Sequence, residues 1–173
     1  MTWCALTMRA MYDKEQELLV FCMRSITNSL CFVRGGSRTP CFLCEKEAVK
    51  RMSTKNGGKG GAIVNVSSAA ARLGSAGEYV DYAASKGAID TFTRGLAQEV
   101  AEEGIRVNAV RPGGIDTDIH ASGGEPGRVE RVKASVPMKR GGSAEEVAKA
   151  IMWLLSSESS YTTGSLLEVS GGR

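Results

Sequence analysis

Three short apolar runs predict three buried β-strands in the last two thirds of the chain. They are Ala62–Ser67, Ile105–Val110 and Leu166–Val169. Between them lie longer segments whose apolar residues recur at helical spacing. Strands that alternate with helices in this way indicate an α/β fold with a parallel sheet, and we expect its crossovers to be right-handed.

The apolar spacing predicts two long helices, one over residues 42–54 and one over residues 78–103. Gly104 is expected to end the second helix as a C-terminal cap. The expected buried positions of the first helix include Phe42, Ala48, Val49 and Met52. The expected buried stripe of the second helix is Ile89, Phe92, Leu96 and Val100.

A capping box, Ser143-Ala144-Glu145-Glu146, predicts the start of another helix. In this motif the serine and the second glutamate can each accept a backbone N–H of the other residue. Trp153 is expected to pack or to lie at an edge. The expected inner face of this helix is Val147, Ile151, Leu154 and Leu155.

The first 40 residues differ in composition from the rest and are expected to form a segment of unknown structure before a domain over residues 41–173. All five cysteines of the chain lie before residue 45. Two apolar runs between residues 14 and 33 are compatible with a hairpin or with a helix. If residues 14–33 leave it uncovered, the strand at 62–67 is a sheet edge, and an exposed apolar edge favours association.

Cys41 and Cys44 form a Cys-x-x-Cys pair, a spacing that also occurs in redox and metal sites. A second pair of ligands is lacking, and the only histidine, His120, is distant in sequence. We therefore favour thiols buried on a helix and expect no metal site. A reducing, cytoplasmic setting is the default for such cysteines.

The charge balance argues against several classes of partner. With 22 basic and 19 acidic side chains, the net charge of +3 is too small to indicate binding of nucleic acid or of an anionic membrane. The most basic stretch, Arg128–Arg140, contains Glu130 and indicates a solvated face. No apolar run reaches the roughly 18 residues of a membrane span.

The candidate chemistry lies where polar residues follow the predicted strands. Tyr82 and Lys86 share one helix face, because they are four residues apart. An ammonium beside a phenol lowers the phenol pKa from about 10, which permits proton exchange with an alcohol or a ketone. Alone, such a pair is more often a solvated surface pair. Here Ser67 and Ser68 follow one strand and Pro112-Gly113-Gly114 the next, at the sheet edge where open α/β folds bind ligands.

These motifs, in this order, resemble the C-terminal part of short-chain dehydrogenases/reductases. The resemblance implies a Rossmann-like, doubly wound parallel sheet. It also implies an oxidoreductase that transfers a hydride between NAD or NADP and a small alcohol or ketone. A further stretch, His120–Arg128, resembles a bacterial glucose or ribitol dehydrogenase-like subgroup. The stretches that carry the family resemblance are Gly61–Ser68, Tyr82–Ala88, Ile105–Thr117 and Thr163–Gly172.

The resemblance implies roles for individual residues. Tyr82 is the expected general acid and base, Lys86 is expected to lower its pKa and to hold the nicotinamide ribose, and Ser68 is expected to bind the substrate oxygen. Ser68 lies fourteen residues before Tyr82, where family members commonly show thirteen, so we expect the extra residue around residues 75–79. Without the resemblance, Ser67 and Ser68 indicate a strand-end turn with helix-cap character. The expected cofactor-binding residues are Tyr82, Lys86, Pro112, Gly113, Ile115 and Thr117.

The Gly-rich turn that opens the family's fold, T-G-x-x-x-G-x-G, does not occur in the sequence. Its glycines let the backbone approach the cofactor pyrophosphate. The sequence therefore indicates an N-terminally truncated member whose cofactor binding could be lost, and it gives neither the substrate nor the choice between NAD and NADP.

Two alternatives to an active enzyme stay open at this point. One is a non-catalytic family member that keeps only its oligomerisation surfaces. The other is a gene-model or frameshift product. Family members pair through two helices that correspond to about 42–54 and 78–103, so the resemblance implies a homo-oligomer.

Overall fold

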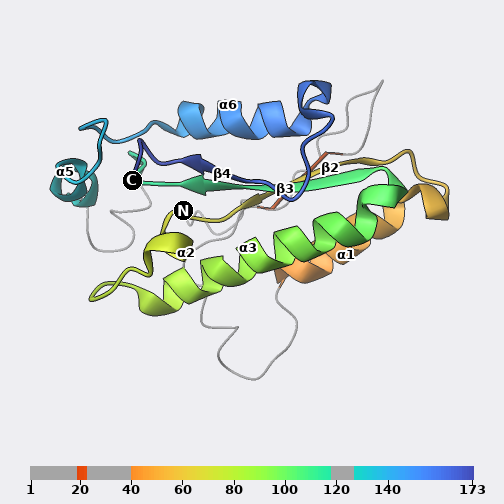
Figure 1. The fold of residues 1–173 in the computed structure, drawn as a ribbon, viewed down its shortest axis with the longest axis horizontal. Helices are drawn as coiled ribbons and strands as arrows, with labels where there is room; N and C mark the ends of the chain where they lie inside the picture. Colours follow the sequence, from red (N-terminus) through yellow and green to blue (C-terminus); the bar gives the residue numbers. More distant parts are fainter. Residues whose placement is uncertain (1–18, 23–39, 118–126) are drawn as a thin grey trace, which may run out of the picture.

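A computed structural model of the chain describes residues 19–22, 40–117 and 127–173 (Figure 1). Within this part, four parallel strands form one sheet in the order β1-β2-β3-β4. Helices cover both faces of the sheet, which gives three layers (Figure 1). The expected Rossmann-like α/β fold class is confirmed.

The four strands are β1 (Leu19–Cys22), β2 (Gly61–Val66), β3 (Ile105–Pro112) and β4 (Leu166–Val169). The last three lie where the apolar runs predict strands, and β1 lies in the segment whose sequence pattern is compatible with a hairpin or a helix. The central pair, β2 and β3, is aligned from Gly61 opposite Ile105 to Val66 opposite Val110. Because these two strands are parallel and in register, the segments that follow them leave the sheet side by side.

β1 occupies the edge of the sheet beside β2. Its four residues pair in parallel with Ala62 to Asn65. For residues 19–22 a helix is therefore excluded, whereas the hairpin stays a prediction, because the second apolar run lies outside the described part. The edge that β2 was expected to expose is covered along these four positions, and the rest of residues 14–33 lies outside the described part.

Three longer helices form the outer layers. α1 (Pro40–Met52) and α3 (Val80–Val100) lie side by side on one face, and α6 (Ala144–Leu155) lies on the other (Figure 1). A 3₁₀ turn at Ala101–Glu103 follows α3, and Gly104 adopts φ 74° as the expected C-terminal cap. Two short helices, α2 (Ala70–Leu73) and α5 (Arg128–Lys133), flank the carboxyl edge of the sheet.

The hand of the crossovers differs from the expectation. Ile63 of β2 packs with residues of α1 and α3, whereas its neighbours Ala62 and Val64 pack with α6. The strand order advances in one direction, so the crossovers through α3 and α6 pass over opposite faces and must have opposite hands. Right-handed crossovers throughout are therefore wrong. The right-handed rule acts on compact βαβ units, and the β3–β4 connection also carries α5.

α3 presents a different face to the sheet than its apolar pattern predicts. Of the expected stripe only Val100 is buried, while Ile89, Phe92 and Leu96 are partly exposed. The buried face carries small and polar side chains, which let the helix approach the sheet closely and bond to it. Its members are Ala83, Lys86, Asp90, Thr93, Ala97 and Val100.

The other helix predictions hold in most positions. The capping box of α6 is formed in both directions, and hydrogen bonds from Arg140 and the Ser143 N–H lower the pKa of Glu146 to about 2. Trp153 lies at an edge with 39% of its surface exposed. Ala48, Met52, Ile151, Leu154 and Leu155 are buried as expected, whereas Phe42, Val49 and Val147 are only partly buried.

Arg106 of β3 anchors the C-terminal end of α6. Its guanidinium donates to the carbonyl oxygens of Leu154 at 2.9 Å and Ser156 at 3.0 Å and to the Ser159 hydroxyl at 2.9 Å. Carbonyl groups at the end of a helix have no partner within the helix. The arginine therefore satisfies them and fixes α6 to the sheet.

Replacement of Arg106 by Met is expected to lower the free energy of unfolding by about 2–4 kcal/mol, because several charge-assisted bonds of about 1.5–3 kcal/mol each are lost non-additively. Denaturant titration followed by circular dichroism measures the change. Lys149→Met, an exposed position on the same helix, is the control and should leave the midpoint unchanged. Equal midpoints for the two variants would contradict the role of Arg106.

Candidate active site

The ends of β2 and β3 hold the candidate site together. The Ser67 N–H donates to the Val110 carbonyl, and the Ala69 N–H donates to the Pro112 carbonyl, both at 2.9 Å. These bonds continue the ladder beyond the strands. The segment that carries Ser68 is thereby fixed beside the Pro-Gly turn.

Lys86 reaches this segment from the buried face of α3. Only 6% of its surface is exposed, and its Nζ donates to the Val66 carbonyl at 2.8 Å. The Ser67 hydroxyl in turn donates to the Lys86 carbonyl at 3.2 Å. The helix turn that carries Lys86 is thus tied to the end of β2 through both its side chain and its backbone.

Tyr82 lies against Ser68 and Lys86. The Lys86 ammonium is 5.6 Å from the centre of the Tyr82 ring, within the range of a cation–π contact. Burial raises the pKa of Tyr82 above its ordinary value of 10, and a hydrogen bond with the Ser68 side chain and the charge of Arg128 act in the opposite direction. The expected lowering of this pKa by Lys86 is therefore wrong: burial outweighs the groups that favour the phenolate.

The longer spacing between Ser68 and Tyr82 does not separate them. The connecting loop takes up positive φ at Gly74, Ser75 and Gly77, which lets it turn back tightly. Ser68 also accepts a hydrogen bond from the Ala70 N–H at 3.1 Å. The serine therefore acts as a turn-forming residue and as the partner of Tyr82 at once.

The residues that are expected to line the nicotinamide lie at the end of β3 and directly after it. Gly113 has no room for a side chain, because an added Cβ would lie 2.8 Å from the Ser170 Cα. Its identity is thus explained by packing against the end of β4. Ile115 forms a bridge with Gly142, and Thr117 is exposed. Pro112 lies beside the Ser68 segment, so of these residues it is the one that the backbone bonds bring closest to the Ser68 loop.

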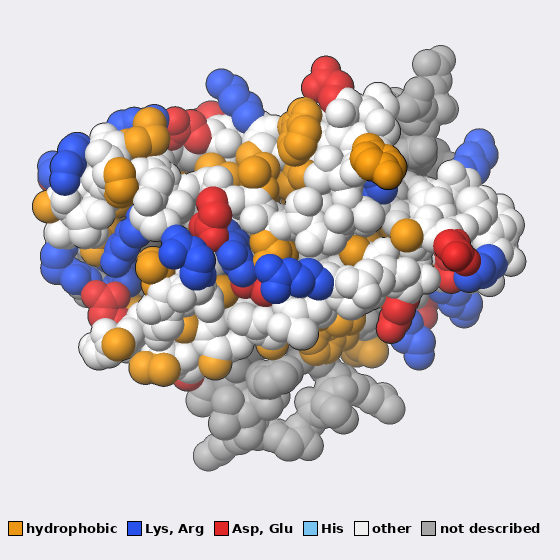
Figure 2. Space-filling view, viewed as in Figure 1, with side chains coloured by type: hydrophobic (Ala, Val, Ile, Leu, Met, Phe, Trp, Pro, Cys, Tyr) orange, Lys and Arg blue, Asp and Glu red, His pale blue; other side chains and the backbone are white. Residues whose placement is uncertain are grey.

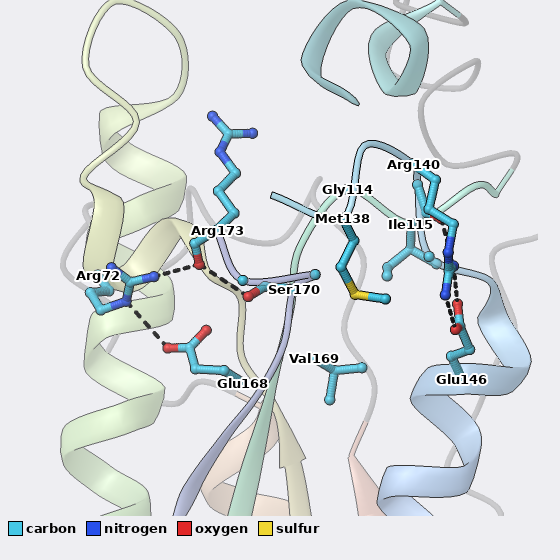
Figure 3. A pocket seen from close by; sticks show the side chains of 14 residues that line it. Arg72, Gly114, Ile115, Met138, Arg140, Glu146, Glu168, Val169, Ser170 and Arg173 are labelled. Carbon is cyan, nitrogen blue, oxygen red and sulfur yellow. Dashed lines mark hydrogen bonds and ion pairs between the residues drawn. The ribbon is translucent and has the colours of Figure 1, made fainter. Parts of the chain in front are cut away.

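A pocket of about 640 Å³ lies beside the ends of β3 and β4 (Figure 3). Arg72 and Arg173 lie on one side and the Arg140–Glu146 ion pair on the other, with Met138 between them (Figure 3). Gly114 and Ile115 line it, but Ser68, Tyr82 and Lys86 do not. The candidate reactive side chains therefore meet at the Tyr82 cluster, outside this pocket.

An ion-pair network beside the cluster is not signalled by the sequence pattern. Arg111 pairs with Asp90 at 2.7 Å and with Glu168 at 3.0 Å, and Glu168 also pairs with Arg72 at 3.3 Å. The sequence gives only a weak signal for this network, namely that two of its members lie next to residues of the candidate site. Asp90 lies one helical turn after Lys86, and Arg111 directly precedes Pro112. The pairing needs residues from four elements, which local patterns do not relate.

The basic stretch after residue 127 contributes more than a solvated face. Arg128 pairs with Glu78 at 2.5 Å and lies 5.1 Å over the Tyr79 ring, and Arg131 also pairs with Glu78 at 3.0 Å. The expectation of a solvated face is otherwise met, because Arg131, Lys139 and Arg140 are exposed. α5 is thereby attached to the start of α3, close enough for Arg128 to affect the Tyr82 pKa.

The described ranges hold no cluster of metal ligands, no disulfide and no membrane-spanning helix. No group of three or more His, Cys, Asp or Glu that could hold a metal occurs there. Cys44 is partly buried on α1 and forms no disulfide with another described residue. Across residues 19–22, 40–117 and 127–173, no helix is long and apolar enough to span a membrane. Basic and acidic side chains are interspersed on the face shown in Figure 2.

Comparison with known proteins defines the class to which this fold and site belong. A family profile described as enoyl-(acyl carrier protein) reductase matches residues 37–173. The match covers most of the chain. The similar proteins described next are named as oxidoreductases or dehydrogenases. The chain therefore belongs to the short-chain dehydrogenase/reductase family.

Individual relatives agree with this assignment. The chain is 71% identical over 135 residues to the uncharacterized oxidoreductase YgfF of Escherichia coli, covering 78% of this chain and 55% of that protein. It is 44% identical over 134 residues to a glucose and ribitol dehydrogenase homolog of Oryza sativa, covering 76% and 44%. The crystal structure of acetoin dehydrogenase YohF from Salmonella typhimurium matches with a TM-score of 0.63 and 40% identity, over 76% and 49%. The chain spans about half the length of the relatives it matches.

The hydrogen bond between Ser68 and Tyr82 predicts a measurable change in the Tyr82 titration. Because this bond lowers the pKa of Tyr82, Ser68→Ala should raise it further. Carbon-13 NMR of labelled tyrosine, assigned with Tyr82→Phe, follows the ionisation. Ser135→Ala, a serine that bonds only to the Val132 carbonyl, should leave the titration unchanged. An unaltered Tyr82 midpoint in Ser68→Ala would contradict the bond.

Proposed function

We propose that this chain carries the catalytic half of an NAD(P)-dependent oxidoreductase that acts on an alcohol or a ketone. The observation that carries the proposal is the cluster of Ser68, Tyr82 and Lys86, in which the Tyr82 phenol bonds to Ser68 and lies beside a buried ammonium. A phenol held in this way is placed to exchange a proton with a substrate oxygen.

The raised pKa favours one direction of the reaction. At neutral pH Tyr82 is a neutral phenol, which can donate a proton to a ketone oxygen as it becomes an alkoxide. Ser68 would orient that oxygen by a second hydrogen bond. We therefore propose reduction of a ketone as the direction that this arrangement supports best.

The residues fit only part of a dinucleotide. Lys86 and Tyr82 would hold the nicotinamide ribose, and Pro112, Gly113, Ile115 and Thr117 would line the ring, with Thr117 near its amide. When bound, a nicotinamide supplies or accepts the hydride. The Gly-rich turn that binds the pyrophosphate in the family is not in the sequence, so the fit extends to the nicotinamide end and no further.

The partially exposed apolar face of α3 supports a second proposal. Ile89, Phe92 and Leu96 are only partly covered within one chain, and Leu43 on the neighbouring α1 is 45% exposed. We propose that α1 and α3 pair with a second copy, which multi-angle light scattering of the purified chain measures. A cytoplasmic location and a small-molecule substrate remain predictions.

Dinucleotide binding by the 173-residue chain is expected to be weak. Charged hydrogen bonds to the pyrophosphate contribute about 1.5–3 kcal/mol each, and every 1.4 kcal/mol is tenfold in affinity, so we expect a dissociation constant no tighter than roughly millimolar. Titration with NADH and NADPH, followed by fluorescence, gives the value. A micromolar constant would mean that residues 1–40 supply a phosphate site.

Turnover is best tested in a hybrid that joins the part of YgfF outside the matched region to the matched part of this chain. In that protein Tyr82→Phe should lower the rate of ketone reduction by about 10²–10⁴-fold, because it removes the proton and keeps the ring. Lys86→Met should also weaken cofactor binding, whereas Ser68→Ala should lower turnover alone. Tyr79→Phe is the matched control and should keep its rate. A Tyr82→Phe hybrid that retains a tenth of the rate or more would overturn the assignment.

A further inference from the structure

Arg111 lies at the centre of the ion-pair network beside the candidate active site. Its Nε and Nη2 both donate to Asp90 Oδ2, at 3.0 and 2.7 Å, and its Nη1 donates to Glu168 Oε1 at 3.0 Å. Glu168 also accepts from Arg72, whose other nitrogen donates to the Arg173 carbonyl at 2.6 Å. The network thus joins α3, β3, β4 and α2.

The central pair is protected from solvent. The side chains of Arg111 and Asp90 are 13% and 6% exposed. Asp90 raises the pKa of Arg111 above its ordinary value, so the guanidinium keeps its charge. A buried pair keeps its geometry better than an exposed one, because water and salt screen it less.

Stability alone does not account for this pair. Burying two charges costs solvation, and apolar replacements of such pairs are often as stable. Asp90 also keeps one buried oxygen, Oδ1, without a hydrogen-bond partner in the part of the chain that the structure describes. An arrangement with this cost is better explained by the position that it imposes on its neighbours.

Those neighbours carry the acid/base cluster. Asp90 lies one turn after Lys86 on the buried face of α3. Tyr82 lies one turn before Lys86 on the same helix. Arg111 directly precedes Pro112, whose carbonyl holds the Ala69 N–H next to Ser68. Arg72 lies on α2, four residues after Ser68. One end of the network therefore holds the helix of Tyr82, and the other holds the segment of Ser68.

We propose that Arg111 is a positioning residue that sets the distance between Ser68 and Tyr82. Through Asp90 it holds the depth and rotation of α3, and through Glu168 and Arg72 it holds α2 against the ends of β3 and β4. The relevance of the Ser68–Tyr82 contact to catalysis rests on the proposed function. The effect of Arg111 on that contact does not. The Tyr82 titration measures it without cofactor or turnover.

The test compares single and double variants of the full chain by carbon-13 tyrosine NMR. Arg111→Met should raise the Tyr82 midpoint as far as Ser68→Ala does, and the double variant should go no further, because both changes remove the same bond. Asp90→Asn should raise it by a smaller step. Loss of the Asp90 charge by itself would favour the phenolate and lower the midpoint, so the sign separates positioning from direct electrostatics.

Arg106→Met is the matched control. It removes an equally bonded arginine from the same strand, so it should lower stability and leave the Tyr82 midpoint in place. The proposal is overturned if Arg111→Met lowers stability and leaves the Tyr82 titration midpoint unchanged. It is also overturned if the midpoint shift of Arg111→Met adds fully to that of Ser68→Ala in the double variant. If Arg111→Met does not fold, Asp90→Asn and Arg111→Lys decide, and an unchanged or lowered midpoint in both overturns it. Failure of the hybrid turnover test would remove the proposed function and leave this result intact.

Discussion

The structure depends on the close packing of the small, polar face of α3 against β2 and β3. Small residues such as Ala83 and Ala97 let the helix approach the sheet, and polar residues then bond to it. Lys86 binds the Val66 carbonyl and Thr93 accepts from Asn65, so the helix is held by specific bonds as well as by apolar contact. Because buried polar groups favour positions where they find partners, these bonds favour one register of the helix on the sheet. That register brings Tyr82 to Ser68.

The same burial determines the proton state of the cluster. A phenol taken out of water keeps its proton more tightly, and for Tyr82 this effect exceeds the opposing effects of Ser68 and Arg128. At neutral pH Tyr82 is therefore a neutral phenol, the form that the proposed function requires of a proton donor. Arg128 comes from α5, which Glu78 attaches to the start of α3. The segment after β3 thus influences the proton affinity of a side chain on another helix.

The chain matches about half the length of its relatives, and its described part forms a continuous layered structure. β1 pairs with β2 and so covers an edge of β2 that would otherwise be open. This pairing is parallel, like the other pairings in the sheet. The motifs of the proposed active site all fall within residues 37–173, which the family profile matches. Under the proposed function, this chain would hold the groups that exchange the substrate proton and would lack the turn that binds the cofactor pyrophosphate in the family.

The sequence by itself determined the features that depend on neighbouring residues. The apolar runs located β2, β3 and β4, the capping box located α6, and Gly104 located the end of the helix before β3. Ser68, Tyr82 and Lys86 could also be selected, because parallel strands bring their carboxyl ends to one edge. Tertiary structure alone decided which face of α3 is buried, the hand of the last crossover, the raised pKa of Tyr82 and the Arg111 network. Each of these depends on the burial and pairing of groups far apart in the chain, and a local pattern carries no information about such partners.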